Sequence, residues 1–144
     1  MADPERFLAL LAALRQSLGV LARYRADVPR DRLLAEVDTQ NMVLFALYRV
    51  VQGCIDLGHH LVAETGLPVP STYREVFRVL GDAGIVDRAL AERLEGWGGM
   101  RNVIAHHYGI IDMTRVATAL YDELDDLEQY ATALARHAPA DAQG

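Results

Sequence analysis

The segment from about Asp31 to Glu64 constrains the fold most, because from Met42 onward it carries apolar residues on nearly every side of a helix. A helix that is apolar all round must be buried on more than one face. Asp31 is a suitable N-cap residue for such a helix. The sequence therefore predicts an all-α fold in which this long helix lies at the centre of a bundle.

Four other segments place apolar residues at the three-four spacing of one helical face, and none alternates with the period of a strand. The expected helices are Pro4 to about Arg25, one opening at Ser71 or Thr72, one capped by Asp87, and a last one from Asp112 or Thr114 to about His137. We therefore expect an all-α helical bundle of four to five helices. It would form a single domain over residues 1–144, with its core at about 5–135 and a frayed tail at 138–144.

Composition limits the possible functions. The formal net charge is −6 and every basic side chain is an arginine, so the chain is not a general nucleic-acid binder, although a local basic site is still possible. Cys54 is the one cysteine and lies in an apolar run, which favours a small buried side chain in a reducing compartment. A zinc site built on cysteines is excluded.

No feature of the sequence indicates a membrane or an export signal. The first residues are acidic and are not followed by the apolar core of a signal peptide. The longest apolar run, Met42 to Val51, is interrupted by Arg49 and is too short to cross a bilayer. We therefore expect a cytoplasmic protein without a membrane partner.

Two local patterns have ordinary structural interpretations. Gly96, Gly98 and Gly99 are poor helix formers, and we expect them to allow close approach of a neighbouring helix or a partner chain. The last helix carries an acidic run that is most simply a solvated face: Asp122, Glu123, Asp125, Asp126 and Glu128.

A polar stripe interrupts the central helix. Gln52, Asp56, His59 and His60 are spaced so that they fall within about 100° of one another on a helical wheel. Polar groups on a buried helix must be paired or must line a cleft. Either these residues satisfy one another near the helix end, or they contribute to a site.

The densest group of chemically versatile residues is Arg101, Asn102, His106, His107 and Tyr108. Asn102 and His106 are four apart and share a helical face, and so do Arg101 and Tyr108 at a spacing of seven. A histidine could remove the proton of a ribose 2′-hydroxyl, and an arginine could stabilise charge on the neighbouring phosphate. Asn102 could orient the imidazole, and Tyr108 could contact phosphate or stack on a base. On spacing alone, such a set is more often a packed polar cap than a catalytic site.

The order of these motifs resembles a known family. The string from Arg101 to Tyr108 is similar to the R-x-x-x-x-H-x-Y signature of the HEPN superfamily, and more narrowly to HepT-like toxins of HEPN–MNT toxin–antitoxin pairs. Three further segments resemble that family in the same order, so the likeness covers about residues 5–135: Gln52 to His60, Pro70 to Phe77, and Gly99 to Asn102.

The resemblance implies a homodimer in which two motif copies face each other across a composite cleft. It implies an RNase that needs no metal or cofactor, with Arg101 and His106 as the catalytic pair and Asn102 beside them. The implied partner is an MntA-like nucleotidyltransferase antitoxin, which binds the toxin, with a possible higher assembly, or adds AMP to Tyr108. Possible cleft-lining residues are Gln52, Asp56, His59 and His107.

Two other functions are alternatives to an RNase. The first is a non-catalytic HEPN module that binds or regulates a nucleotidyltransferase, which the acidic net charge suits. The second is a metal-binding bundle built on the histidines and Asp56. It is disfavoured because Glu-x-x-His pairs from facing helices are missing and Arg101 would repel a cation.

Overall fold

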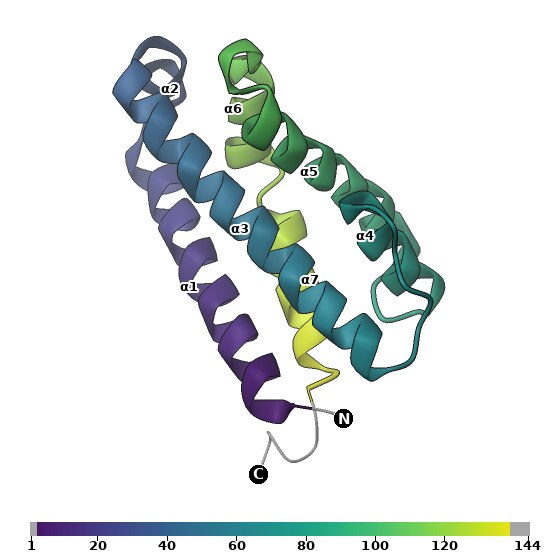
Figure 1. Cartoon of the computed structure of the whole chain (residues 1–144). Helices are drawn as coiled ribbons and strands as arrows, with labels where there is room; N and C mark the ends of the chain where they lie inside the picture. The colour runs from purple at the N-terminus through teal and green to yellow at the C-terminus, as the bar shows by residue number, and fades with distance from the viewer. Residues whose placement is uncertain (1–2, 139–144) are drawn as a thin grey trace.

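Helices and the loops between them make up the whole of residues 3–138, the part of the chain that the computed structural model describes (Figure 1). The tail expected to fray lies mostly outside these residues. The elements are α1 (Pro4–Asp27), α2 (Arg30–Ala35), α3 (Val37–Glu64), α4 (Tyr73–Asp82), α5 (Arg88–His106), the 3₁₀ turn η1 (Tyr108–Ile110), α6 (Met113–Asp122) and α7 (Asp125–Ala135).

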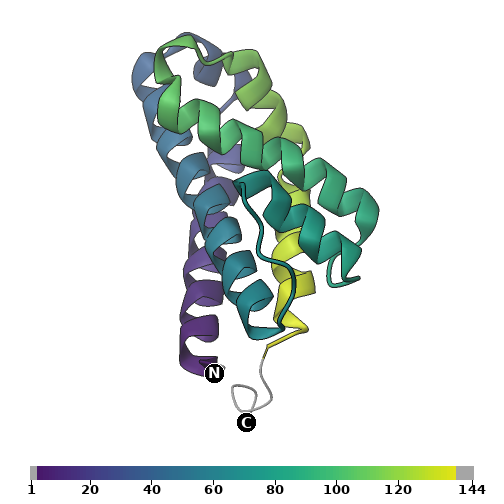
Figure 2. The ribbon, with the colours of Figure 1, turned by 45° about the vertical axis from the view of Figure 1, so that its right-hand side comes forward.

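Helix α3 is the centre of the fold, and the predicted all-α bundle around it is confirmed. It packs along α1 on one side and against α4, α5 and α7 on others (Figures 1 and 2). Cys54 on α3 is fully buried, as expected, and its carbonyl oxygen accepts a hydrogen bond from the hydroxyl of Tyr130 at 2.7 Å. The single tryptophan, Trp97 of α5, is also buried in this core.

The number of helices was predicted too low, because two expected helices are each divided in two. The backbone is extended at Glu36, with φ −108° and ψ 119°, so α2 turns away from α3 and buries Leu33 while it packs against α6. The last helix is interrupted at Glu123 and Leu124, between α6 and α7. Asp31 does not cap the central helix, since Pro29 precedes α2 and Glu36 precedes α3.

The other predicted helix starts are confirmed by their caps. The side chains of Asp3, Thr72, Asp87 and Asp112 each accept a hydrogen bond from a backbone N–H in the first turn of the helix that follows. These bonds satisfy donors that a helix start otherwise leaves without a partner.

Small residues allow the helices around α3 to approach closely. A Cβ atom on Gly98 would lie 3.4 Å from Arg74 and Phe77 of α4, so the expectation of close approach is confirmed there, whereas Gly96 faces open space. Gly58 of α3 is tighter, because a Cβ atom would lie 2.5 Å from the hydroxyl oxygen of Tyr130.

The acidic run is not a purely solvated face, and that expectation was wrong. Asp126 is buried and its carboxylate accepts a hydrogen bond from Nε of Arg93 at 3.0 Å, which joins α7 to α5. The other carboxylates are nearer the surface and pair with arginines of α1, α2 and α6: Asp125 and Glu128 with Arg25, Asp122 with Arg30, and Glu123 with Arg115. The acidic run therefore helps to hold α6 and α7, the two halves of the divided last helix, against the helices beside them.

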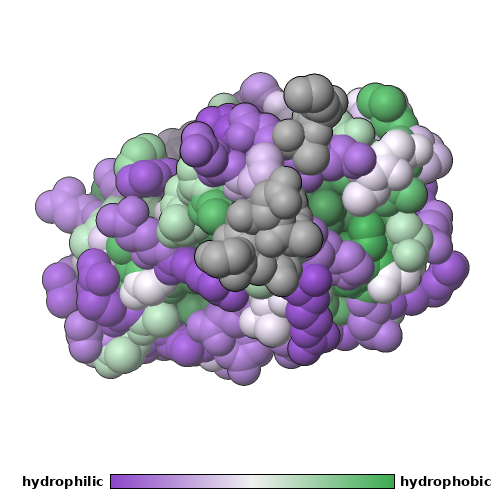
Figure 3. All heavy atoms as spheres, turned by 90° about the horizontal axis from the view of Figure 1, so that it is seen from below, coloured by the Kyte–Doolittle hydropathy of each residue, from purple (hydrophilic) through white to green (hydrophobic). Residues whose placement is uncertain are grey.

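Helix α1 is the one described helix that is long and apolar enough, by length and composition, to cross a membrane. The prediction of no membrane span rested on the apolar run Met42 to Val51, which lies in α3. In the fold, α1 packs on α3 through one buried stripe that includes Phe7, Leu14 and Leu21. The end of the bundle where the two termini lie has a mainly hydrophilic surface with separate apolar patches (Figure 3).

Candidate active site between α3 and α5

Arg101 is the centre of the site. It lies on α5 and is only 8% exposed, yet it has no ion pair with a carboxylate among the described residues. Its Nε donates to Oε1 of Gln52 at 2.8 Å, its Nη2 to the hydroxyl of Tyr48 at 3.2 Å, and its Nη1 to Oδ1 of Asn102 at 3.3 Å. The guanidinium is therefore held firmly by neutral groups and keeps its positive charge locally uncompensated.

Two tyrosine rings enclose the guanidinium. Its central carbon lies 4.4 Å from the ring centre of Tyr73 and 5.1 Å from that of Tyr48. Cations are attracted to aromatic faces, so this stacking stabilises Arg101 without neutralising its charge.

Part of the predicted polar stripe supports Arg101. Nε2 of Gln52 donates to Oδ1 of Asp56 at 2.9 Å, so the amide oxygen of Gln52 is turned toward Arg101. Asp56 thus orients the amide, and the Gln52 side chain lies between the Asp56 carboxylate and the guanidinium. Both earlier interpretations of the stripe hold for these two residues, since they pair with each other and reach the site.

A pocket of about 490 Å³ brings together several of the predicted side chains. Arg101 does not line it but contacts two residues that do, Tyr73 and Asn102. His106 and Asn102 of α5 line it together with His59 of α3. The remaining lining residues are Pro70, Ser71, Thr72 and Tyr73, which lead into α4. The expected bond from Asn102 to the imidazole is not found among the described residues, where the Asn102 side chain instead accepts from Arg101.

The rim of this pocket is fixed by the start of α4. The carboxylate of Glu75 accepts hydrogen bonds from the backbone N–H and the hydroxyl of Ser71, at 2.8 and 2.7 Å. The N–H of Glu75 in turn donates to the hydroxyl of Thr72 at 3.2 Å. The bonds from Ser71 favour the charged carboxylate and hold the pKa of Glu75 below its ordinary value.

The end of the motif departs from the expected helix. Helix α5 stops at His106, and His107 leaves the helical region with φ −133° and ψ 38°. His107 therefore lines a different, mainly apolar pocket with Met100 and Ile111, and its predicted place in a cleft between two copies stays a prediction. Tyr108 does not share a helical face with Arg101 either, because it begins the turn η1.

Tyr108 still lies on the same side of the fold as the site. Its side chain is 51% exposed, and its hydroxyl donates to Oδ1 of Asn41 on α3. This contact joins the motif turn to the central helix. An exposed phenol can be reached by a second protein.

The remaining histidine of the stripe does not reach the site. His60 turns toward α1, where its Nε2 lies 2.9 Å from Oε1 of Glu64 and its ring lies near Phe7. Together with the displaced His107, this separates the side chains that a metal-binding bundle would need. No cluster of three or more His, Cys, Asp or Glu side chains suited to a metal is found in the described part of the chain.

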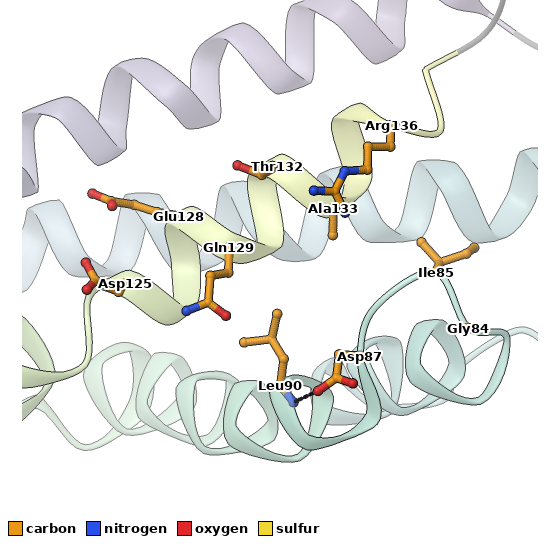
Figure 4. Close-up of a pocket in the computed structure, with 10 residues that line it drawn as sticks. All are labelled: Gly84, Ile85, Asp87, Leu90, Asp125, Glu128, Gln129, Thr132, Ala133 and Arg136. Carbon is orange, nitrogen blue, oxygen red and sulfur yellow. Dashed lines mark hydrogen bonds between the residues drawn. The ribbon is translucent and has the colours of Figure 1, made fainter.

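A second hollow, of about 740 Å³, lies between α7 and the start of α5 and has no comparable chemistry (Figure 4). The carboxylate of Asp87 there caps α5 by accepting from the N–H of Leu90. Asp125 and Glu128 pair with Arg25. Its acidic groups are therefore already engaged in holding helices together.

Sequence reasoning missed three residues of the site. Tyr48 and Tyr73 enclose Arg101, and Asn41 receives the hydroxyl of Tyr108. Tyr48 is four residues before Gln52, so the spacing of the polar stripe could have included it. Tyr73 and Asn41 are joined to the motif only by the tertiary fold.

The helical arrangement and the arginine–histidine site define the chain as a HEPN-like all-α protein. A family model described as HepT-like, Ribonuclease HepT-like, matches residues 14–134. The chain therefore belongs to the HepT-like family, and the resemblance seen in the sequence is confirmed. A relative named mRNA nuclease HepT, from Shewanella oneidensis, is 28% identical over 91 residues, which are 63% of this chain and 68% of that protein.

Solved structures share the fold. The tri-AMPylated Shewanella oneidensis HEPN toxin in complex with MNT antitoxin superposes with a TM-score of 0.82, at 21% identity, over 94% of this chain and 99% of that one. Bacillus subtilis YutE, described as a cytosolic protein of unknown function, gives a TM-score of 0.82 at 13% identity, over 98% of this chain and 97% of that one. At these identities the likeness establishes the HEPN fold alone.

Proposed function

We propose that this chain is the toxin RNase of a HEPN–MNT toxin–antitoxin pair. It would act in the cytoplasm as a single domain and would cleave RNA without a metal ion. The observation that carries this proposal is Arg101, a nearly buried cation that is held by neutral partners beside a pocket with His106. Membership of the HepT-like family supports RNA as the substrate class.

Arg101 is the group that would bind the scissile phosphate. A guanidinium has five N–H donors, and three of them are used by Gln52, Tyr48 and Asn102. Two donors therefore remain, one on each terminal nitrogen, which suits two phosphate oxygens. As the 2′-oxygen attacks phosphorus, negative charge builds on these oxygens and Arg101 would stabilise it.

His106 is the group that would move protons. It takes the proton from the ribose 2′-hydroxyl, whose oxygen attacks the adjacent phosphorus while the bond to the 5′-oxygen breaks. The products are a 2′,3′-cyclic phosphate and a 5′-hydroxyl, and the 5′-oxygen takes a proton from a second acid. His106 of a second copy would be that acid, and where that imidazole is absent water would supply the proton more slowly. His59 lines the same pocket and would contact the substrate rather than perform the proton transfer.

A homodimer would complete the site. Around the motif the chain exposes apolar side chains, with Val103 39%, Tyr108 51% and Ile110 79% exposed. Burying such groups against an identical copy would be favourable and would bring two sets of Arg101 and His106 to one composite cleft.

The antitoxin would act on the exposed tyrosine. In AMP addition, the phenol oxygen of Tyr108 attacks the α-phosphate of ATP, pyrophosphate leaves, and the phenol proton passes to a base of the nucleotidyltransferase. The new phosphodiester adds a negative charge and an adenosine group beside the motif. RNA phosphates would then be repelled and sterically excluded, so the toxin would stay inactive for as long as the AMP group remained attached. Binding of the antitoxin alone would cover the same surface.

The proposal is tested by incubating a mixed RNA pool with purified wild-type protein and the His106→Ala variant in EDTA, with the mass of the oligomer measured alongside. We expect cleavage by the wild type only, and the same loss for Arg101→Ala. Unfolding of both variants would assign the motif a structural role. Cleavage by folded His106→Ala would contradict the proposed base, and inactivity of a folded wild-type dimer would favour the non-catalytic nucleotidyltransferase partner instead.

A further inference from the structure

A groove of about 330 Å³ runs between α1 and α3, next to the face of α3 that carries Tyr48 and Gln52. Figures 1 and 2 both show these two helices side by side over much of their length. Arg23 stands on the α1 side of the groove, and Phe45 and Arg49 stand on the α3 side. The other lining residues are Ser17, Val20, Tyr24, Met42 and Ala46.

The two arginines of the groove differ from most others in the chain. Seven of the 14 arginines form ion pairs with carboxylates: Arg25, Arg30, Arg32, Arg78, Arg88, Arg93 and Arg115. Arg23 and Arg49 are exposed and form none within the described residues. In an acidic protein, two exposed and unpaired cations on either side of one groove create a local binding surface for anions.

An aromatic ring lies beside one of these cations in the same groove. Phe45 is 64% exposed, and the guanidinium of Arg49 lies 5.9 Å from its ring centre. Proteins that bind single-stranded nucleic acids combine arginines for the phosphates with aromatic faces on which bases stack. The groove therefore has both components of such a surface.

The groove is also close to the proposed active site. Arg49 is three residues before Gln52, so the two residues are about 4.5 Å apart along the axis of α3. Gln52 holds Arg101, the group proposed to bind the scissile phosphate, so Arg49 lies within one helical turn of the residue that positions it. A strand that leaves the pocket across α3 would enter the groove.

We propose that this groove binds a single-stranded part of the RNA substrate next to the cleaved bond. Arg23 and Arg49 contact phosphates, and one base stacks on Phe45. This inference rests on the proposed RNase function and adds a binding subsite to it. A second copy of the chain is a poorer occupant, because the residues that line the groove include no carboxylate to pair with the arginines of the other copy, whereas RNA supplies a phosphate for each.

The test measures binding of a fluorescent 20-nucleotide RNA of mixed sequence to the full chain carrying His106→Ala, so that no cleavage occurs. The test variant adds Arg23→Gln and Arg49→Gln. The matched control adds Arg6→Gln and Arg136→Gln, which remove the same charge from exposed sites outside the groove. A third variant adds Phe45→Ala. Each affinity is measured over a range of salt concentrations, and each oligomeric mass is determined.

We expect the double arginine variant to lose about 25-fold in affinity at roughly 0.1 M salt. The slope of log affinity against log salt concentration should become shallower by about 1.4, which corresponds to the loss of two phosphate contacts with a single strand. Phe45→Ala should weaken binding by at least about fivefold with an unchanged salt dependence, because stacking involves no counterion. The control should stay within about twofold of the parent.

Equal losses in the test variant and the control would overturn the inference, since only net charge would then matter. A change of oligomeric mass in Phe45→Ala would also overturn it and would assign the groove to a contact between copies. The proposed function is judged separately by cleavage with the wild type. RNA that binds through the groove without being cut would leave the inference standing and remove the RNase assignment.

Discussion

At the scale of single residues, the site depends on how Arg101 is compensated. Gln52 and Tyr48 satisfy its donors with neutral oxygens, whereas a carboxylate in either place would pair with the cation and compete with phosphate. Asp56 is the carboxylate in this hydrogen-bond chain, and it contacts Arg101 only indirectly, by accepting a bond from the Gln52 amide. The arrangement fixes the direction of the guanidinium and preserves its charge for a substrate anion.

The Gln52→Leu variant tests this arrangement. Leucine has a similar size but leaves Nε of Arg101 without its acceptor, which costs about 1–3 kcal/mol for a buried donor. We expect RNA cleavage to fall at least about tenfold, because one such bond also aims the guanidinium. Asp56→Asn is the control, since its amide oxygen can still accept from Gln52 and most activity should remain. A fully active Gln52→Leu enzyme would contradict the role given to the amide.

Gly58 provides a second test at this scale, of packing rather than chemistry. A Cβ atom there would lie 2.5 Å from the hydroxyl oxygen of Tyr130 and 2.7 Å from Cγ1 of Val76. Gly58→Ala should therefore lower the free energy of unfolding by roughly 1–3 kcal/mol. Gly19→Ala on α1 is the matched control, because its Cβ would meet open space and should stabilise by about 0.5–1 kcal/mol. Urea denaturation measures both, and equal effects would refute the proposed clash.

At the scale of elements, the start of α4 connects stability with the site. Glu75 fixes Ser71 and so holds the loop that lines the pocket. A carboxyl whose folded pKa lies below its unfolded value adds stability that is present above the unfolded pKa, and this stability is lost as pH falls through the folded pKa. The cap of one helix therefore makes the rim of the site sensitive to acid.

The Glu75→Gln variant tests that linkage. Its melting temperature should be below that of the wild type near neutral pH, and the difference should shrink as the pH falls through the lowered pKa of Glu75. Glu92→Gln, on the exposed face of α5, is the control and should melt like the wild type at neutral pH. A difference that stays constant down to acidic pH would show that the carboxylate charge is not responsible.

The elements also show which parts of the fold local sequence patterns can predict. The starts of α1, α4, α5 and α6 were predictable because a capping side chain and an apolar stripe lie within a few residues of each other. The breaks at Glu36 and Leu124 were not, since neither has a glycine or proline beside it. There the packing of α2 on α6 and the ion pair of Asp126 with Arg93 determine the path of the chain.

The same distinction applies to the site. Arg101, Asn102, His106 and Tyr108 stand together in the sequence, so a motif could identify them. Tyr73 could not be assigned in this way, because it meets Arg101 from a helix far away along the chain, and Tyr48 could be assigned only through its spacing from Gln52. The turn of the backbone after His106 was equally hidden, and it is the reason that His107 and Tyr108 point to different places.

At the scale of the whole molecule, the proposed composite cleft can be tested by mixing two inactive variants. Arg101→Ala and His106→Ala homodimers should each be inactive. A mixed dimer would carry one intact Arg101 and one intact His106 across the shared cleft, so we expect part of the activity to return after subunit exchange. Native mass spectrometry checks that mixed dimers form, and their inactivity would indicate that each protomer must supply both groups itself.

The buried position of Trp97 has a practical consequence for all of these variants. It is the one tryptophan of the chain, and it lies on α5 four residues before Arg101, one helical turn away. Its fluorescence therefore reports the environment of the helix that carries the site without any attached dye. A blue-shifted emission spectrum that matches the wild type would show that α5 is still packed in an inactive variant, whereas a red shift would reveal a loosened helix.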